Sequence, residues 1–231
     1  MVTFNYPMIP ILLRFDGGDA GDSMPAHAWG EAAAGWRGDD TMFGGDGDDT
    51  LEGDQGNDLI DGGDDDDRLN GGTGDDTVRG GDGDDYIFEN TGEDSLLGGD
   101  GDDTILGDEN DDALDGGKGD DWLHGDHGDD RLKGGKGNDV LAGGMGDNTL
   151  EGGDGEDTFR IANLSGRDLI VDFDELKDHV DITYSHLADF AAVRDRAEDV
   201  DDGVLLHLRE NGELLIEGVS RDDLQADWFV L

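Results

Sequence analysis

The sequence lacks several features that many folded proteins use. It has no cysteine and only 3 prolines, and its 15 Lys and Arg residues are far outnumbered by 62 Asp and Glu residues. Without cysteine, disulfide bonds and thiolate metal sites are excluded. No apolar run is long enough to span a membrane. The net charge of -47 repels nucleic acid and anionic lipid, so the expected partners are cations.

The composition by itself favours disorder. Only 33% of the 231 residues are hydrophobic and 6% are aromatic, while 42 are glycine. Such a chain buries too little apolar surface to offset the conformational entropy lost on folding. A regular pattern in the sequence is therefore needed to argue for a fold.

That pattern is an internal repeat of nine residues. From Gly35 to Arg160 the chain divides into fourteen blocks without an insertion, as in GGDGDDTLE at residues 44–52. The eighth position is apolar in every block, and the sixth is Asp in all blocks except the one with Asn148. A disordered linker has no reason to keep this register.

Each position of the block has a physical use. Glycines at positions one, two and four permit positive φ and close backbone approach, so the first six residues form a tight turn with inward carbonyl groups. The last three residues then form a strand that directs one apolar side chain into a thin core. Two blocks make one coil, and we predict an all-β fold, a parallel β-roll with a β-rich C-terminal cap.

Stacked coils bring many carboxylates together, and a divalent cation between the coils would relieve their repulsion. Carboxylate and carbonyl oxygens in a flexible cage favour Ca²⁺ over Mg²⁺ or a transition metal. We therefore expect several calcium ions. The candidate ligands are the aspartates at the sixth position: Asp40, Asp49, Asp58, Asp67, Asp76, Asp85, Asp94, Asp103, Asp112, Asp121, Asp130, Asp139 and Asp157.

These blocks resemble the calcium-binding nonapeptide G-G-x-G-x-D-x-U-x of the RTX, or hemolysin-type, family. The resemblance covers residues 35–160. It implies a β-roll with calcium between successive coils, folding on extracellular calcium, and export by type I secretion machinery. The expected location is therefore extracellular.

The blocks differ by parity. Those starting at 44, 62, 80, 98, 116, 134 and 152 all keep two leading glycines. In the other set the second glycine is often replaced, namely by Trp36, Asp54, Asn90, Asp108 and Asp126. We expect roughly six to ten ions, with fuller sites on the first edge and weak or empty sites around 89–94 and 107–112.

The segments outside the array are less regular. Residues 1–34 have no assigned fold and form a poor signal peptide. Residues 161–231 begin with a segment that resembles the one closing RTX rolls, in which Asp168, Asp172 and Asp178 fall in register. Two apolar runs around Asn211-Gly212 predict a hairpin. The family resemblance implies that the uncleaved C-terminus is the secretion signal.

No catalytic motif is evident, and we expect the chain not to be an enzyme. His27 and Glu31 lack the second histidine of a zinc protease motif. His124 and His127 invite zinc, but their variable positions favour solvated side chains.

Two other questions stay open at this point. One is the role of an apolar stripe, which either packs under residues 9–15 or docks a partner; its members are Tyr86, Phe88, Leu106 and Trp122. The other is whether the chain is the export and folding module of a protease, lipase or epimerase that lacks its catalytic part, or a short surface or adhesion module.

Overall fold

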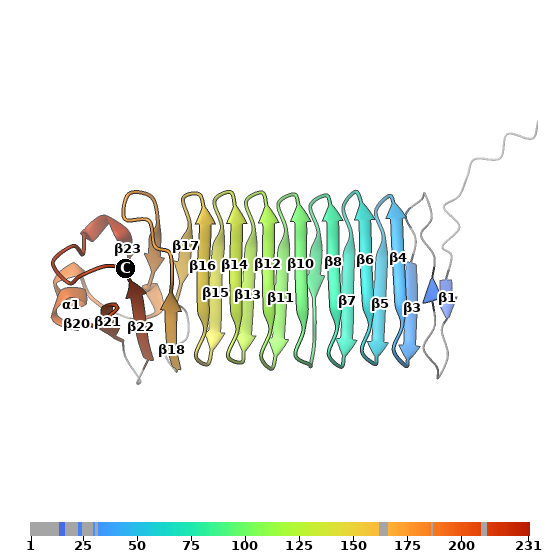
Figure 1. Ribbon diagram of the computed structural model, residues 1–231, viewed down its shortest axis with the longest axis horizontal. Helices are drawn as coiled ribbons and strands as arrows, with labels where there is room; N and C mark the ends of the chain where they lie inside the picture. Colours follow the sequence, from blue (N-terminus) through green and yellow to red (C-terminus); the bar gives the residue numbers. More distant parts are fainter. Residues whose placement is uncertain are drawn as a thin grey trace, which may run out of the picture.

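The computed structural model describes residues 14–16, 23–24, 30, 32–161, 166–185, 187–208 and 212–231. In this part of the chain two long sheets face each other, and successive strands alternate between them along the axis of the molecule (Figure 1). Pairing within the repeat region is parallel throughout, as in Ser95↔Ala113 and Leu96↔Leu114. The offset of eighteen residues confirms two nonapeptides per coil and the predicted parallel β-roll.

The first sheet has eleven strands. They are β1 (Arg14–Asp16), β3 (Ala32–Arg37), β5 (Thr50–Gln55), β7 (Arg68–Thr73), β9 (Tyr86–Phe88), β11 (Thr104–Glu109), β13 (Trp122–His127), β15 (Val140–Met145), β17 (Thr158–Arg160), β19 (His179–Asp181) and β23 (Phe229–Val230). A full strand consists of the last three residues of one block and the first three of the next. The tight turn therefore needs only positions four to six.

The second sheet has twelve strands. They are β2 (Ser23–Met24), β4 (Thr41–Asp46), β6 (Leu59–Asp64), β8 (Thr77–Asp82), β10 (Ser95–Asp100), β12 (Ala113–Lys118), β14 (Arg131–Lys136), β16 (Thr149–Asp154), β18 (Gly166–Ile170), β22 (Gly212–Glu217), β21 (Gly203–His207) and β20 (Ala197–Val200). Since the sheets face each other, each contributes one layer of side chains to the core.

The core is the row of apolar side chains at the eighth position. Each of these fourteen side chains is at most 2% exposed, from Met42 to Phe159. Their neighbours at positions seven and nine face mainly outward, because side chains alternate along a strand. One apolar residue in nine is thus enough to fill so thin a core.

Left-handed backbone at the second position is imposed by the coil and not by glycine alone. Where glycine is replaced, φ remains positive at Trp36 (83°), Asp54 (73°), Asp108 (77°) and Asp126 (78°). Such a conformation costs a non-glycine residue on the order of 1 kcal/mol or more. At Asn90 the chain takes another path, and β9 ends early at Phe88.

The two sheets continue beyond the fourteen blocks at both ends. β1 and β2 pair in parallel with β3 and β4, and β18, β19, β22 and β23 extend the stack at the C-terminal end. The predicted hairpin is confirmed by antiparallel pairing of β21 with β22; Asn211 in its turn lies outside the described residues. The domain boundaries at 34/35 and 160/161 stay predictions, since strands of both sheets lie on either side of each.

The C-terminal region also carries the one α-helix of the described residues, α1 (Phe190–Asp195), and two short 3-10 helices, Thr183–Ser185 and Ala226–Trp228. Asp189 caps α1 by accepting the N–H of Ala192. Within the described ranges no helix is long and apolar enough to cross a membrane.

Candidate metal centre

The sixth-position aspartates form two columns, one along each edge of the roll. Eleven of them, Asp58 and those after it along the chain, each accept at Oδ1 the backbone N–H of the aspartate eighteen residues earlier, at 2.6 to 2.9 Å. One column holds Asp40, Asp58, Asp76, Asp94, Asp112 and Asp130, and the other holds Asp49, Asp67, Asp85, Asp103, Asp121, Asp139 and Asp157. All thirteen predicted ligands are buried, with at most 3% exposure.

Eleven of these carboxylates have one oxygen without a hydrogen bond. Their Oδ2 atoms are buried and have no hydrogen-bond partner: Asp58, Asp67, Asp76, Asp85, Asp94, Asp103, Asp112, Asp121, Asp130, Asp139 and Asp157. A buried oxygen without a partner is costly, and more so when it belongs to a charged group. The same unfavourable burial recurs in eleven blocks, which indicates that these oxygens are positioned to bind a cation.

Burial also raises the pKa of these eleven carboxyl groups. The pKa of Asp103 rises to about 8 and that of Asp67 to about 7, mainly through loss of solvation and further through repulsion by neighbouring carboxylates. The N–H bond to Oδ1 acts in the opposite direction and offsets part of this rise. The charged form is therefore less favourable than it is in water, and a positive charge brought close would stabilise it.

The first glycine of a block leaves open the space into which Oδ2 points. A Cβ at Gly98 would overlap with Asp103 Oδ2 and would lie 2.6 Å from the carbonyl oxygen of Gly116 in the next coil. The same pair of oxygens, one carboxylate and one carbonyl, borders Gly44, Gly53 and Gly62. An all-oxygen recess of this kind fits a hard cation such as Ca²⁺, and thiolate or imidazole ligands are not part of it.

The columns end in residues that sequence reasoning did not count as candidate ligands. Asn148 accepts the N–H of Asp130 at Oδ1, while its Nδ2 donates to Asp168 Oδ1 at 2.8 Å. On the other edge, Asp178 Oδ1 accepts the N–H of Asp157 at 3.0 Å. The amide of Asn148 thus has partners for both of its polar atoms within the protein, whereas Oδ2 of Asp112 and Oδ2 of Asp130 have none.

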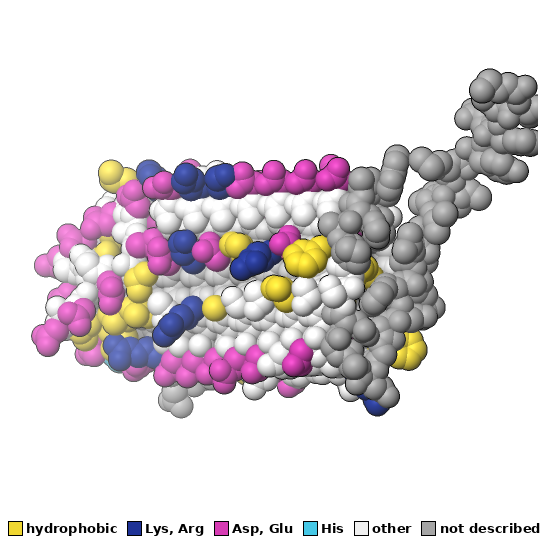
Figure 2. All heavy atoms as spheres, turned by 45° about the vertical axis from the view of Figure 1, so that its right-hand side comes forward, with side chains coloured by type: hydrophobic (Ala, Val, Ile, Leu, Met, Phe, Trp, Pro, Cys, Tyr) yellow, Lys and Arg dark blue, Asp and Glu magenta, His cyan; other side chains and the backbone are white. Residues whose placement is uncertain are grey.

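A second ladder of side chains was missed from the sequence. Residues at the fifth position accept, at 2.7 to 3.1 Å, the N–H of the residue one coil later, opposite in direction to the sixth-position ladder. The signal was present, because every block has Asp, Asn or Glu at this position. Figure 2 shows that acidic side chains gather in rows along the roll.

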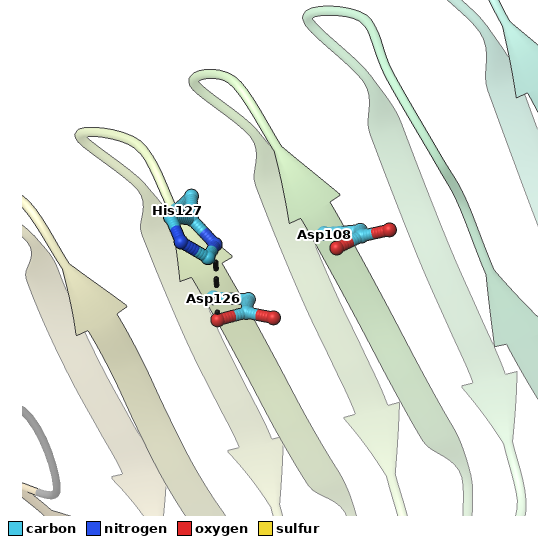
Figure 3. Close-up of side chains that lie close together, drawn as sticks. All are labelled: Asp108, Asp126 and His127. Atoms are coloured by element: carbon cyan, nitrogen blue, oxygen red, sulfur yellow. Dashed lines mark ion pairs between the residues drawn. The ribbon is translucent and has the colours of Figure 1, made fainter.

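A separate cluster lies on the surface of the first sheet (Figure 3). Asp108 of β11 and Asp126 of β13 are register partners, and His127 Nδ1 lies 3.2 Å from Asp126 Oδ1. His124 is not part of this group; its ring stacks on Trp122 with centroids 6.1 Å apart. The side chains of Asp126 and His127 are 42% and 52% exposed. Such open groups do not amount to the two-histidine zinc site considered from the sequence.

The apolar stripe lies on the outer face of the first sheet. The Arg68 guanidinium lies over the rings of Tyr86 and Phe88, 4.8 and 4.5 Å from their centroids. Trp122 remains 38% exposed. The segment considered as its cover, residues 9–15, lies largely outside the described residues, so both interpretations of the stripe stay predictions.

Comparisons with known proteins identify a family and similar solved structures. A family model described as the RTX calcium-binding nonapeptide repeat matches residues 35–60, 61–88, 90–123 and 124–159. The solution structure of the AlgE6R3 subunit of the mannuronan C5-epimerase from Azotobacter vinelandii is 33% identical, with a TM-score of 0.43, over 54% of this chain and 79% of that one.

A further solved structure is the extracellular lipase LipA from Serratia marcescens, which is 22% identical with a TM-score of 0.42. The match covers 80% of this chain and 40% of the lipase. Among curated proteins the comparison finds no match. Since the four family matches together span more than half of the sequence, the chain belongs to the family of proteins with RTX calcium-binding nonapeptide repeats.

Proposed function

We propose that this chain is a secreted calcium-binding protein whose β-roll folds when it binds extracellular calcium. The observation that carries the proposal is the set of eleven buried Oδ2 atoms without hydrogen-bond partners, arranged coil after coil along both edges. Two further observations support it. The family is one of calcium-binding repeats. The raised pKa values of the buried aspartates, such as Asp103, mean that a nearby cation would stabilise their charged form.

The protein's own groups would prepare each site before the ion arrives. The N–H of the preceding coil fixes Oδ1, so that Oδ2 is directed into the recess beside the first glycine, as in the pair Asp85 and Asp103. A carbonyl oxygen of the next coil borders the same recess. A bound cation would supply the charge that these oxygens lack, and would link adjacent coils. Ion binding and folding are thereby coupled.

Counting bound metal tests this proposal. We expect roughly six to ten calcium ions per chain by equilibrium dialysis and elemental analysis, at affinities of about 0.1 to 1 mM as in other extracellular modules. Magnesium should not replace calcium, because it demands near-ideal octahedral geometry and keeps several waters. A chain that retains no calcium above the level of a non-binding control protein contradicts the proposal.

We further propose export by a type I route with the address at the C-terminus. Deleting residues 227–231 should leave the protein in the cytoplasm of a host with a matching transporter. This deletion also removes packing, because Trp228 contacts Phe173 with centroids 5.2 Å apart and β23 pairs with β19. Phe173→Ala is the matched control, since it loosens the same contact without touching the last residues.

Secretion should be measured as the fraction of protein in the culture medium. The control variant is expected outside the cell, since export precedes calcium-dependent folding. Normal secretion of the deletion would refute the C-terminal address, while retention of both variants would mean that cap packing and not the address decides export.

We propose a binding and folding role rather than catalysis for the chain itself. The sixth-position aspartates of the repeat region are at most 3% exposed, so a substrate larger than an ion could not reach them. Whether the chain serves as the export and folding module of a separate enzyme, or as a surface module, is decided by which macromolecule it retains in a binding assay with calcium present.

A further inference from the structure

One block departs from the others at its first position. Glu89 stands where the other thirteen blocks have glycine. Its side chain is only 2% exposed and reaches back to the preceding coil, where Oε1 accepts the N–H of Gly71 and Oε2 that of Gly72, both at 2.8 Å. The substitution has therefore placed a carboxylate, not a loose side chain, between two coils.

The position of this carboxylate becomes clear by comparison with the preceding coil. At Gly53 an added Cβ would overlap with Asp58 Oδ2 and with the carbonyl oxygen of Gly71. At Gly71 the corresponding neighbours are Asp76 Oδ2 and Glu89 Oε2, each 2.5 Å from the Cβ position. A carboxylate oxygen of Glu89 thus takes the place of a backbone carbonyl oxygen in the recess.

Three carboxylates consequently meet at this point. Oxygens of Asp76, Glu89 and Asp94 all lie within 4.8 Å of one another, and all three residues are buried. The Oδ2 atoms of Asp76 and Asp94 have no hydrogen-bond partner. In the described part of the chain this is the one buried group of three; the other, around His127, is open to solvent.

We propose that Asp76, Glu89 and Asp94 together form a calcium site of higher affinity than the regular sites of the roll, with Glu89 as an additional side-chain ligand. This inference rests on the proposed calcium-binding function. It reverses the expectation of a weak or empty site around residues 89–94, which was based on the loss of glycine alone.

Two physical reasons support the higher affinity. Calcium affinity rises with the number of charged ligands and with the rigidity of the site. Glu89 adds a third carboxylate group, and the two N–H groups that donate to it hold it in place before the ion binds, which lowers the ordering cost of binding. The backbone also makes room for the Glu89 side chain. Strand β9 ends at Phe88, and the chain rejoins the sheet at Thr91, which pairs with Thr73 and Glu109.

The test is a calcium titration of the full chain in competition with a chromophoric chelator, which resolves the tightest ion. Glu89→Gly restores the glycine of the regular blocks, and Glu89→Gln keeps the shape but removes the charge. Both should weaken the tightest step about tenfold or more while later steps remain. Glu93→Gln, an exposed acid in the same block, has the same charge change and should titrate as the wild type.

The outcomes separate the two proposals. If the wild type binds several calcium ions but its tightest step is unchanged in both Glu89 variants, Glu89 is not a ligand and this inference is overturned. If the wild type binds no calcium, the proposed function is wrong, and so is this inference, which depends on it. Circular dichroism at saturating calcium shows whether each variant folds, and a folded Glu89→Gly chain without the tight step supports the site.

Discussion

Replacing Asp85, Asp103 and Asp121 together by Asn should affect the two states of the protein in opposite ways. Without calcium, β content measured by circular dichroism in chelator should rise above that of the wild type. With calcium, the concentration needed for half-maximal folding should increase about tenfold or more, because three charged ligands are lost. These three residues are consecutive members of one column.

The reason for the opposite effects lies in the amide group. An Asn keeps the Oδ1 acceptor for the preceding N–H and removes the buried charge. At position 103 its nitrogen would face the carbonyl oxygen of Gly116, to which it could donate. The chain already contains an Asn at the sixth position in the other column, where Asn148 accepts from Asp130 and donates to Asp168.

A matched control makes the same change of net charge in the second ladder, which is formed by the fifth-position residues. Asp84, Asp102 and Asp120 are exposed fifth-position residues that accept N–H groups from the next coil. Their replacement by Asn should leave the calcium midpoint near that of the wild type. A sixth-position triple variant that is less folded than the wild type both in chelator and in calcium would contradict the expected relief of charge repulsion in the metal-free roll.

Acid should partly substitute for calcium. In chelator, lowering the pH from about 8 to about 4 should increase β content, because the metal-free roll holds protons on its buried aspartates more tightly than the unfolded chain does. Their pKa rises from 3.8 to about 6 for Asp58, about 7 for Asp121 and about 8 for Asp103. The folded state therefore binds more protons across this window, so its stability is highest below about pH 4 and falls as the pH rises through the folded pKa values.

The calcium-bound roll should show the reverse dependence, since protons compete with the ion for the same oxygens. Circular dichroism recorded against pH, with chelator and with excess calcium, should give curves of opposite slope. The triple Asn variant should show a smaller slope in chelator. A β content in chelator that stays constant or rises with pH contradicts the assignment of raised pKa values to these residues.

The repeat alone was sufficient to predict the fold and the candidate ligands. The apolar residue at the eighth position, such as Leu51, fills the interior of the roll. The residue at the sixth position, which is Asp in every block but one, acts at the turn. The core residues and the candidate ligands both follow from the nine-residue period and the chemistry of the side chains, without knowledge of which residues contact one another. The two-edge arrangement also followed, because a period of eighteen residues assigns alternate blocks to opposite edges.

Features that depend on contacts between coils were not predictable in the same way. The fifth-position acids were visible in the sequence, but only the structure shows that Asp102 accepts from Asp120, in the direction opposite to the Asp103 ladder. From the sequence alone, the loss of glycine in the block that starts with Glu89 predicts a weak or empty site around residues 89–94. The Glu89 carboxylate lies beside Asp76 because the chain leaves the regular path after Phe88, which no block-by-block comparison reveals.

The central claim is that calcium and folding of the roll are coupled. The most direct test is a calcium titration of the wild-type chain at neutral pH, followed by circular dichroism and small-angle X-ray scattering on the same samples. We expect an expanded chain with little β structure in chelator and a compact, β-rich one once calcium is saturating. A compact chain with full β content in chelator would contradict the account.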